Sequence, residues 1–400
     1  MNWVIKENND NESVKRLSNE LNISPILSSM LVNRRIKTFD QAKKFFRPNF
    51  EMLHDPFLMK DMSLAVERIQ KAIQKNESIM IFGDYDVDGT SSVALLSMYL
   101  ESLGLKIIKY LPDRKKEGYG VSINAIDHAF SKNQKLIIAL DCGIKAHKQV
   151  EYAKEKGIEF IICDHHNPDK NLPKALAILN PKRKDCAYPF KELCGCGVGF
   201  KLVQAIESKQ SKDNQIINYL DLVALAIAAD VVPLTGENRV LSFIGLQIIN
   251  SNPRPGVHSL LKKNVKKEYT ISDLMYYVGP RINAAGRMKH ASLALELLIC
   301  NDINSVEKLA LEIEDLNTSR RDIEKDITSQ SIEQVDNSSE KLNSIVVFDS
   351  DWNKGVIGIV ASRLVDKYYK PSIVFCESSK GVLTASARSI KGLDLYSVLN

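Results

Sequence analysis

Three carboxylates alternate within a short segment that directly follows an apolar run of the chain. The run is residues 79–82, and Asp84, Asp86 and Asp88 follow it in a glycine-flanked turn. An apolar run, such a turn and helical spacing from Val93 onward are typical of a strand–turn–helix unit, in which ligands bind beyond the carboxyl end of the strand. A solvated loop would also tolerate this pattern. Acids crowded at one point repel one another unless a cation lies among them, and oxygen ligands favour hard ions such as Mg²⁺ and Mn²⁺.

Three further apolar runs also end in an acid or a histidine. With the run that each follows, these residues are Asp141 after 136–140, Asp164, His165 and His166 after 160–163, and Asp230 after 225–229. Parallel strands present their carboxyl ends at one edge of a sheet, so we expect these side chains to converge. Any one of them could be a capping Asp or a core His. Together they form a mixed Asp/His set that suits a two-metal phosphodiester or phosphoanhydride site.

The order of apolar segments predicts an α/β fold with a parallel sheet covered on both faces. Strands are expected at 79–83, 106–111, 136–141, 159–164 and 175–179, and helices near 62–75, 91–103, 121–131, 146–156, 197–209 and 217–229. A charge-rich segment with apolar residues at helical spacing, about 305–338, predicts a long solvent-bridging helix. A second α/β unit begins at Ile345.

This organisation predicts four parts of the chain. They are an N-terminal helical extension (1–54), a main domain (55–300, with a sheet core at 55–235 and a helical part at 236–300), a long connecting helix (301–340) and a small α/β domain (341–400). No stretch reaches the ~20 apolar residues of a membrane helix, and the N-terminus lacks a secretory signal. We therefore expect a cytoplasmic protein without a membrane partner.

Charge and cysteine content add less. The net charge of +5 does not by itself indicate nucleic-acid binding, but eight Lys or Arg residues lie between Arg254 and Lys289. Such patches are what a groove along a phosphate backbone needs, although many surface charges are simply solvated. The seven cysteines have no zinc-site spacing, so we expect them to be reduced and structural.

The segment Asp164-His165-His166, with the acidic turn at 84–89, resembles the DHH phosphoesterase superfamily and most closely its RecJ family of bacterial exonucleases. Similar segments follow in the same order from about residue 55 to the C-terminus, at 111–120, 279–288, 355–364 and 385–389. The resemblance implies a parallel-sheet DHH domain joined by a long helix to a smaller α/β DHH-associated domain. The family usually continues with a Gly-Gly-His segment and an OB-fold, so we expect the domain at 341–400 to be incomplete.

The resemblance also implies roles for particular residues. One or two Mn²⁺ or Mg²⁺ ions would be held by Asp84, Asp86, Asp141, His165 and Asp230, with Asp141 bridging. Imidazole among the ligands favours Mn²⁺. His166 would face the scissile phosphate as a donor, and Asp88 would orient ligands. The terminal 5′ phosphate would be held by Arg114, Ser386 and Arg388, and the nearby cleft would be lined by Arg281, Asn283 and Arg287.

The activity implied is metal-dependent 5′→3′ exonuclease action on single-stranded DNA. It would release 5′-mononucleotides in DNA repair and recombination, through a monomer that works with a single-stranded-DNA-binding protein and a repair helicase. A DHH-type hydrolase of short oligonucleotides, cyclic dinucleotides or other small phosphoesters is the alternative. Such relatives carry a His four positions before the first Asp, where this chain has Met80. A third possibility is a non-catalytic nucleic-acid-binding scaffold, but scaffolds lose acids and histidines that this chain keeps.

Overall fold

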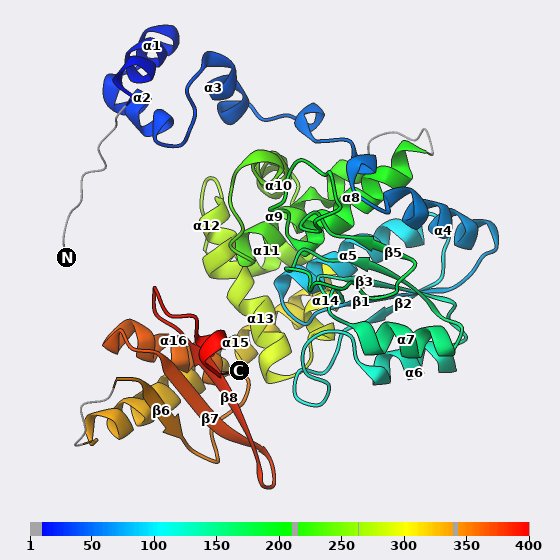
Figure 1. The fold of residues 1–400 in the computed structure, drawn as a ribbon, viewed down its shortest axis with the longest axis vertical. Coiled ribbons are helices and arrows are strands. Elements are labelled where there is room, and N and C mark those ends of the chain that lie inside the picture. The colour runs from blue at the N-terminus through cyan, green and yellow to red at the C-terminus, as the bar shows by residue number, and fades with distance from the viewer. Residues whose placement is uncertain (1–9, 210–214, 263, 339–342, 400) are drawn as a thin grey trace.

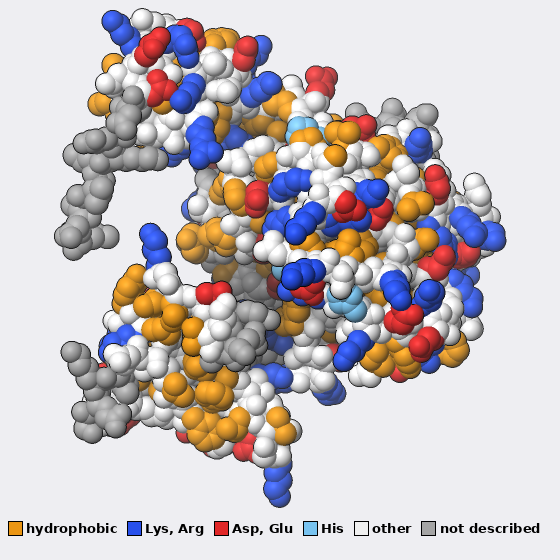
Figure 2. Space-filling view, in the orientation of Figure 1, with side chains coloured by type: hydrophobic (Ala, Val, Ile, Leu, Met, Phe, Trp, Pro, Cys, Tyr) orange, Lys and Arg blue, Asp and Glu red, His pale blue; other side chains and the backbone are white. Residues whose placement is uncertain are grey.

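The structure is a computed structural model that describes residues 10–209, 215–262, 264–338 and 343–399. An N-terminal helical unit and a C-terminal α/β domain project from a larger central α/β domain, with an open notch between them (Figures 1 and 2). The N-terminal unit comprises α1 (Asn11–Leu21), α2 (Pro25–Val32) and α3 (Phe39–Phe46). Its small core includes Leu17, and Ser24 caps α2 by accepting the N–H of Leu27.

Five parallel strands form the central sheet in the order β2-β1-β3-β4-β5. They are β1 (Ile79–Gly83), β2 (Ile107–Tyr110), β3 (Leu136–Leu140), β4 (Glu159–Cys163) and β5 (Ala177–Leu179). Every residue of β1 and β3 is buried, as expected for strands covered on both faces. The register pairs Gly83 with Leu140 and Leu140 with Cys163, so three strands end side by side.

Helices cover both faces of this sheet (Figure 1). One face packs on α6 and α7 through Met80 and Phe82, and the other packs on α4, α5 and α8 through Ile79 and Ile81. The helices are α4 (Met62–Gln74), α5 (Val87–Ser102), α6 (Ile123–Ser131), α7 (His147–Glu155), α8 (Gly195–Ser208), α9 (Leu220–Ala229), α10 (Gly236–Ser251), α11 (Pro255–Leu261), α12 (Ile271–Asp273), α13 (Gly279–Met288) and α14 (Ser292–Ile299). Short 3₁₀ turns lie at η1 (Phe50–Met52), η2 (Pro56–Leu58) and η3 (Gln215–Tyr219), and the π-turn η4 (Leu274–Val278) precedes α13.

The long helix α15 (Ile303–Asp336) connects the central domain to the C-terminal domain. The second sheet has the order β6-β7-β8, parallel between the first two strands and antiparallel between the last two. Its elements are β6 (Ile345–Phe348), α16 (Ile357–Tyr368), β7 (Ser372–Ser379), β8 (Val382–Arg388) and α17 (Leu395–Leu399). Ile327 of α15 shares a core with this sheet and α16.

The expected fold class is confirmed: a parallel sheet with helices on both faces is joined by a long helix to a smaller α/β domain. The helix expected at 217–229 is confirmed as the buried helix α9, so Asp230 follows a helix and does not end a strand of the sheet. Across the described residues, no helix is long and apolar enough to cross a membrane. All seven cysteines are unpaired.

Candidate metal centre

The carboxyl ends of neighbouring strands bring the candidate site together. Asp84 follows β1, Asp141 follows β3, and His165 and His166 follow β4. Because these strands end in register, the four side chains lie at one edge of the sheet. Asp230 reaches the same edge from a different direction, as the residue that ends α9. Convergence was therefore expected correctly, although one of its contributors is helical.

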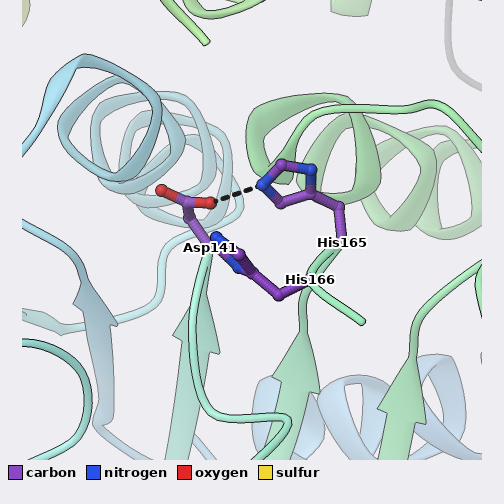
Figure 3. A group of neighbouring side chains, drawn as sticks. All are labelled: Asp141, His165 and His166. Atoms are coloured by element: carbon purple, nitrogen blue, oxygen red, sulfur yellow. Dashed lines mark ion pairs between the residues drawn. The ribbon is translucent and has the colours of Figure 1, made fainter. Parts of the chain in front are cut away.

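Asp141, His165 and His166 form the first group that could hold a metal ion. Nε2 of His165 lies 3.1 Å from Oδ1 of Asp141, and both side chains are buried (Figure 3). Asp141 has a left-handed backbone (φ 59°), and its N–H donates to the carbonyl of Cys163 at 2.9 Å. Strained backbone of this kind in a non-glycine residue is common at functional sites.

Asp88, His165 and Asp230 form a second group that shares His165 with the first. Nε2 of His165 lies 3.8 Å from Oδ2 of Asp88 and 3.7 Å from Oδ2 of Asp230. Asp88 also accepts the backbone N–H groups of Gly195 and Cys196 at 2.6 and 2.7 Å, which fixes its carboxylate at the start of α8. Asp88 is thus held in place, as expected for a residue that orients metal ligands. Its carboxylate also belongs to a group that could itself hold a metal ion.

Asp84 and Asp86 lie outside both groups but act on them electrostatically. The carboxylate of Asp86 accepts the N–H of Gly89 at 3.0 Å and caps α5. Asp84 is buried, and burial together with the charge of Asp86 raises its pKa to about 7. Burial raises the pKa of Asp141, and the charges of Asp86 and Asp84 add to this rise. Asp84 and Asp86 therefore add negative charge to the site, and their direct contact with an ion remains a prediction.

Protonation in the site follows from burial and from like charges. Burial, followed by the charges of Asp230 and Asp86, raises the pKa of Asp88 to about 8. Burial and Asp86 raise the pKa of Asp230 to about 6. Burial lowers the pKa of His165 to about 4, so its imidazole is neutral and able to bind a metal at neutral pH.

These residues fit a divalent cation. Oδ1 of Asp84, Oδ1 of Asp141 and both ring nitrogens of His165 are buried, and none has a hydrogen-bond partner among the described residues. Buried polar atoms normally form hydrogen bonds, so buried carboxylate oxygens and ring nitrogens that form none at one edge of the sheet need a further explanation. A cation bound by carboxylate and imidazole would supply it. Met80 is fully buried in β1 and contributes no such atom.

Asp164 lies within the site and holds its histidines, although no role was predicted for it from the sequence. Its Oδ1 accepts from Nδ1 of His166 at 2.8 Å and from the N–H of His165 at 2.7 Å, and its Oδ2 accepts the N–H of Ile144 at 2.9 Å. Burial alone would raise the pKa of Asp164, but these hydrogen bonds outweigh it and lower the pKa. The bond to Asp164 raises the pKa of His166. The position of Asp164 directly before two histidines was the signal in the sequence that could have indicated this role.

The candidate substrate residues lie where the central and C-terminal domains meet. The guanidinium of Arg114 stacks on the ring of Tyr85 at 4.7 Å, and Arg287 donates to the carbonyl of Gly355 at 3.0 Å. Arg388 donates to Oγ of Ser386 at 3.3 Å. Both side chains come from β8 and lie against Gly358 in the first turn of α16.

Other cations of this region are already paired. Arg281 forms an ion pair with Glu314 of α15 at 2.7 Å, and Arg254 forms one with Asp221 at 2.9 Å. Lys262, Lys266 and Lys289 are paired with acids as well. The basic stretch between Arg254 and Lys289 is therefore largely neutralised, and among the residues that the structure describes no contact of Asn283 points to a role. The assignments of Arg281, Asn283 and Arg287 to the cleft remain predictions.

Comparison with known proteins agrees with this geometry. Residues 78–227 match the model of the DHH family, N-terminal domain, and residues 341–400 match the DHHA1 domain. The chain is 37% identical over 401 residues to the single-stranded-DNA-specific exonuclease RecJ of Haemophilus influenzae, covering 96% of this chain and 69% of that protein. The chain belongs to the RecJ family.

Two further RecJ proteins are similar to it. RecJ of Bacillus subtilis is 39% identical over 406 residues, covering all of this chain and 50% of that protein. The crystal structure of RecJ from Thermus thermophilus in complex with Mn²⁺ matches with a TM-score of 0.82 and 26% identity, covering 96% of this chain and 54% of that one. The chain thus spans about half to two thirds of the length of these RecJ relatives.

Proposed function

We propose that this chain is a metal-dependent exonuclease that acts on single-stranded DNA. The observation that carries the proposal is the convergence of Asp141, His165 and Asp230, with unpaired buried ligand atoms, in a member of the RecJ family. Release of 5′-mononucleotides in the 5′→3′ direction, a role in repair and recombination, a cytoplasmic location and a monomeric state belong to the same proposal. They rest on the resemblance to the family.

Asp84, Asp86, Asp141, His165 and Asp230 would hold one or two Mn²⁺ or Mg²⁺ ions, with Asp88 as a further candidate. Such an ion lowers the pKa of water and offsets charge on phosphate oxygens. His166 would donate from Nε2 to the scissile phosphate, because Nδ1 is occupied by Asp164. Its raised pKa favours the charged ring, which is the stronger donor.

The 5′→3′ polarity would come from residues of both the central and the C-terminal domain. Arg114, Ser386 and Arg388 offer a guanidinium pair and a hydroxyl, which suit a terminal phosphate. The charge of Arg114 opposes the rise in the pKa of Asp84, which supports a position of Arg114 near the metal residues. A strand held there by its 5′ end would place its first internucleotide bond near His166.

Digestion of end-labelled oligonucleotides tests the proposal. Single-stranded and duplex DNA and RNA, labelled at the 5′ or the 3′ end, are incubated with Mn²⁺, Mg²⁺ or EDTA. We expect metal-dependent loss of single-stranded DNA with early release of the 5′ label as a mononucleotide. Early release of the 3′ label, or selective hydrolysis of di- and trinucleotides, would favour a different phosphoesterase.

A further inference from the structure

A groove lies between the N-terminal helical unit and the central domain, and its volume is about 1260 Å³. One wall comes from the end of α2 and from α3, and the other comes from the chain around η1 and from the start of α10. We call it the α3–α10 groove. The lining residues that matter below are Arg34, Arg35, Lys44, Glu51, Leu234 and Arg239.

The α3–α10 groove carries an excess of unpaired positive charge. Its four cations form no ion pair with any part of the chain that the structure describes. The acids of the lining are Glu51 and Glu237, and Glu237 is already paired with Lys201 at 3.1 Å. Figure 2 shows Lys and Arg side chains gathered where the N-terminal unit meets the central domain. Unpaired cations along a groove attract a phosphate backbone.

Arg35 has a backbone conformation that favours glycine. It follows α2 with a φ of 64°, and its N–H donates to the carbonyl of Val32 at 2.8 Å. Glycine adopts this left-handed conformation at the end of a helix without cost, whereas a residue with a side chain is strained there. The side chain of Arg35 is exposed. A long cation thus stands where the local fold favours glycine, which indicates a use for its side chain on the groove.

Arg239 joins the two walls of the α3–α10 groove. From α10, its Nε donates to the carbonyl of Phe45 in α3 at 2.7 Å, and its guanidinium lies over the ring of Phe45 at 3.6 Å. Because Nε makes the hydrogen bond to the backbone, the two Nη groups can still donate to a phosphate oxygen. The groove therefore has a fixed cation at its base and mobile, exposed cations along its rim.

A short connection leads from the metal centre to the α3–α10 groove. Asp230 belongs to the metal centre, and Leu234, four residues later, lines the groove. An extended chain spans at most about 3.6 Å per residue, so the Cα atoms of these two residues lie no more than about 14 Å apart. Val231 and Leu234 are exposed apolar side chains on this connection. A strand bound at the metal centre therefore needs to extend only a short way to reach the groove.

We propose that the α3–α10 groove binds the phosphate backbone of the single strand on the 3′ side of the cut. The inference rests on the proposed function, because an exonuclease that works from the 5′ end leaves only the 3′ part of the strand outside its site. Contacts to phosphates carry no sequence information, as a nuclease that degrades any strand requires. The groove would hold the strand between successive cuts.

Binding in EDTA tests this inference without cleavage. Fluorescence anisotropy measures the affinity for a long single strand of about 30 nucleotides and for a short one of about 4, over a range of salt concentrations. In the double variant Arg34→Ala, Lys44→Ala, both at exposed positions, the affinity for the long strand should fall at least about tenfold at 0.1 M salt. The slope of log K against log salt should become less steep by about 1.4, or about 0.7 per lost phosphate contact. The short strand should bind as it does to wild type.

Arg35→Gly separates binding from folding. It removes one cation and also the backbone strain, so the melting temperature should rise while the affinity for the long strand falls about fivefold. Lys15→Ala removes an exposed cation of α1 outside the groove and should change neither quantity.

Wild-type affinity of the double variant for the long strand would overturn the inference. An equal loss for the short strand, or in Lys15→Ala, would also overturn it, because the effect would then not come from the groove. Failure of the proposed function would look different, since it would appear in the digestion of end-labelled strands and not in these metal-free binding measurements.

Discussion

At the scale of single residues, crowding of carboxylates decides how the site responds to pH. Asp84 and Asp88 have pKa values raised to about 7 and about 8, mainly by burial. A carboxyl group whose folded pKa exceeds its unfolded value stabilises the fold below the unfolded pKa, and this stabilisation is lost as pH rises through the folded pKa. The metal-free site is therefore expected to destabilise the protein in the alkaline range.

We predict that the melting temperature in EDTA falls by at least a few degrees between pH 6 and pH 9, and that Mn²⁺ reverses the fall. Calorimetry or circular dichroism over this range measures both effects. In Asp84→Asn the fall should be smaller, because one of the raised carboxyl groups is gone. A metal-free protein that grows more stable toward pH 9 would contradict the electrostatic account of the site.

Asp141→Asn tests the residue that lies closest to His165. The amide keeps the shape of the side chain but removes the charge, so Mn²⁺ affinity should drop more than about a hundredfold, since even indirect partners of a ligand cost ~10–100-fold. Titration calorimetry measures this loss. The same variant should be more stable than wild type in EDTA at pH 9, because repulsion with Asp88 is removed. Weakened binding together with a lower melting temperature would indicate misfolding instead.

At the scale of elements, the start of α8 positions Asp141. A Cβ on Gly195 would lie 2.5 Å from Cβ of Asp141, which leaves no room for any side chain there. We predict that Gly195→Ala costs about 1–3 kcal/mol of stability, the usual cost of overpacking, and also weakens Mn²⁺ binding. Gly199→Ala on the same helix is the matched control, because its Cβ would meet only the flexible Leu140 side chain at 3.2 Å. Equal metal affinity in the two variants would exclude a positioning role for Gly195.

Elements of the sheet could be predicted from the sequence because apolar runs bounded by Gly and Asp leave few alternatives. The strand at 79–83 and the convergence of Asp141 with His165 follow from that pattern. The helix before Asp230 was also predicted, so the argument from the ends of parallel strands does not apply to that residue, which reaches the site from the end of α9. The hydrogen bond of Asp164 to the backbone of Ile144 could not be predicted, because it joins two loops that are distant in sequence, although the adjacency of Asp164 to two histidines was a local signal.

At the scale of the whole molecule, the residues proposed to bind the 5′ phosphate come from two domains. Arg114 comes from the central domain, while Ser386 and Arg388 come from the C-terminal domain. We predict that Arg388→Ala weakens use of 5′-phosphorylated strands by about 1.5–3 kcal/mol, the range for hydrogen bonds to charged groups. Strands with a 5′ hydroxyl should be much less affected. Steady-state kinetics on both substrates measure the difference, with Lys380→Ala as the control on the exposed β7–β8 turn. Equal losses on both substrates would show that Arg388 does not bind the 5′ phosphate.

The central claim is that the convergent Asp and His residues hold a metal ion that drives removal of nucleotides from the 5′ end of single-stranded DNA. The most direct test is a time course on one 5′-labelled single strand with wild type and Asp141→Asn, each in Mn²⁺ and in EDTA. We predict early release of labelled mononucleotide only by wild type in Mn²⁺. Release that persists in EDTA, or in a folded Asp141→Asn protein, would contradict the account.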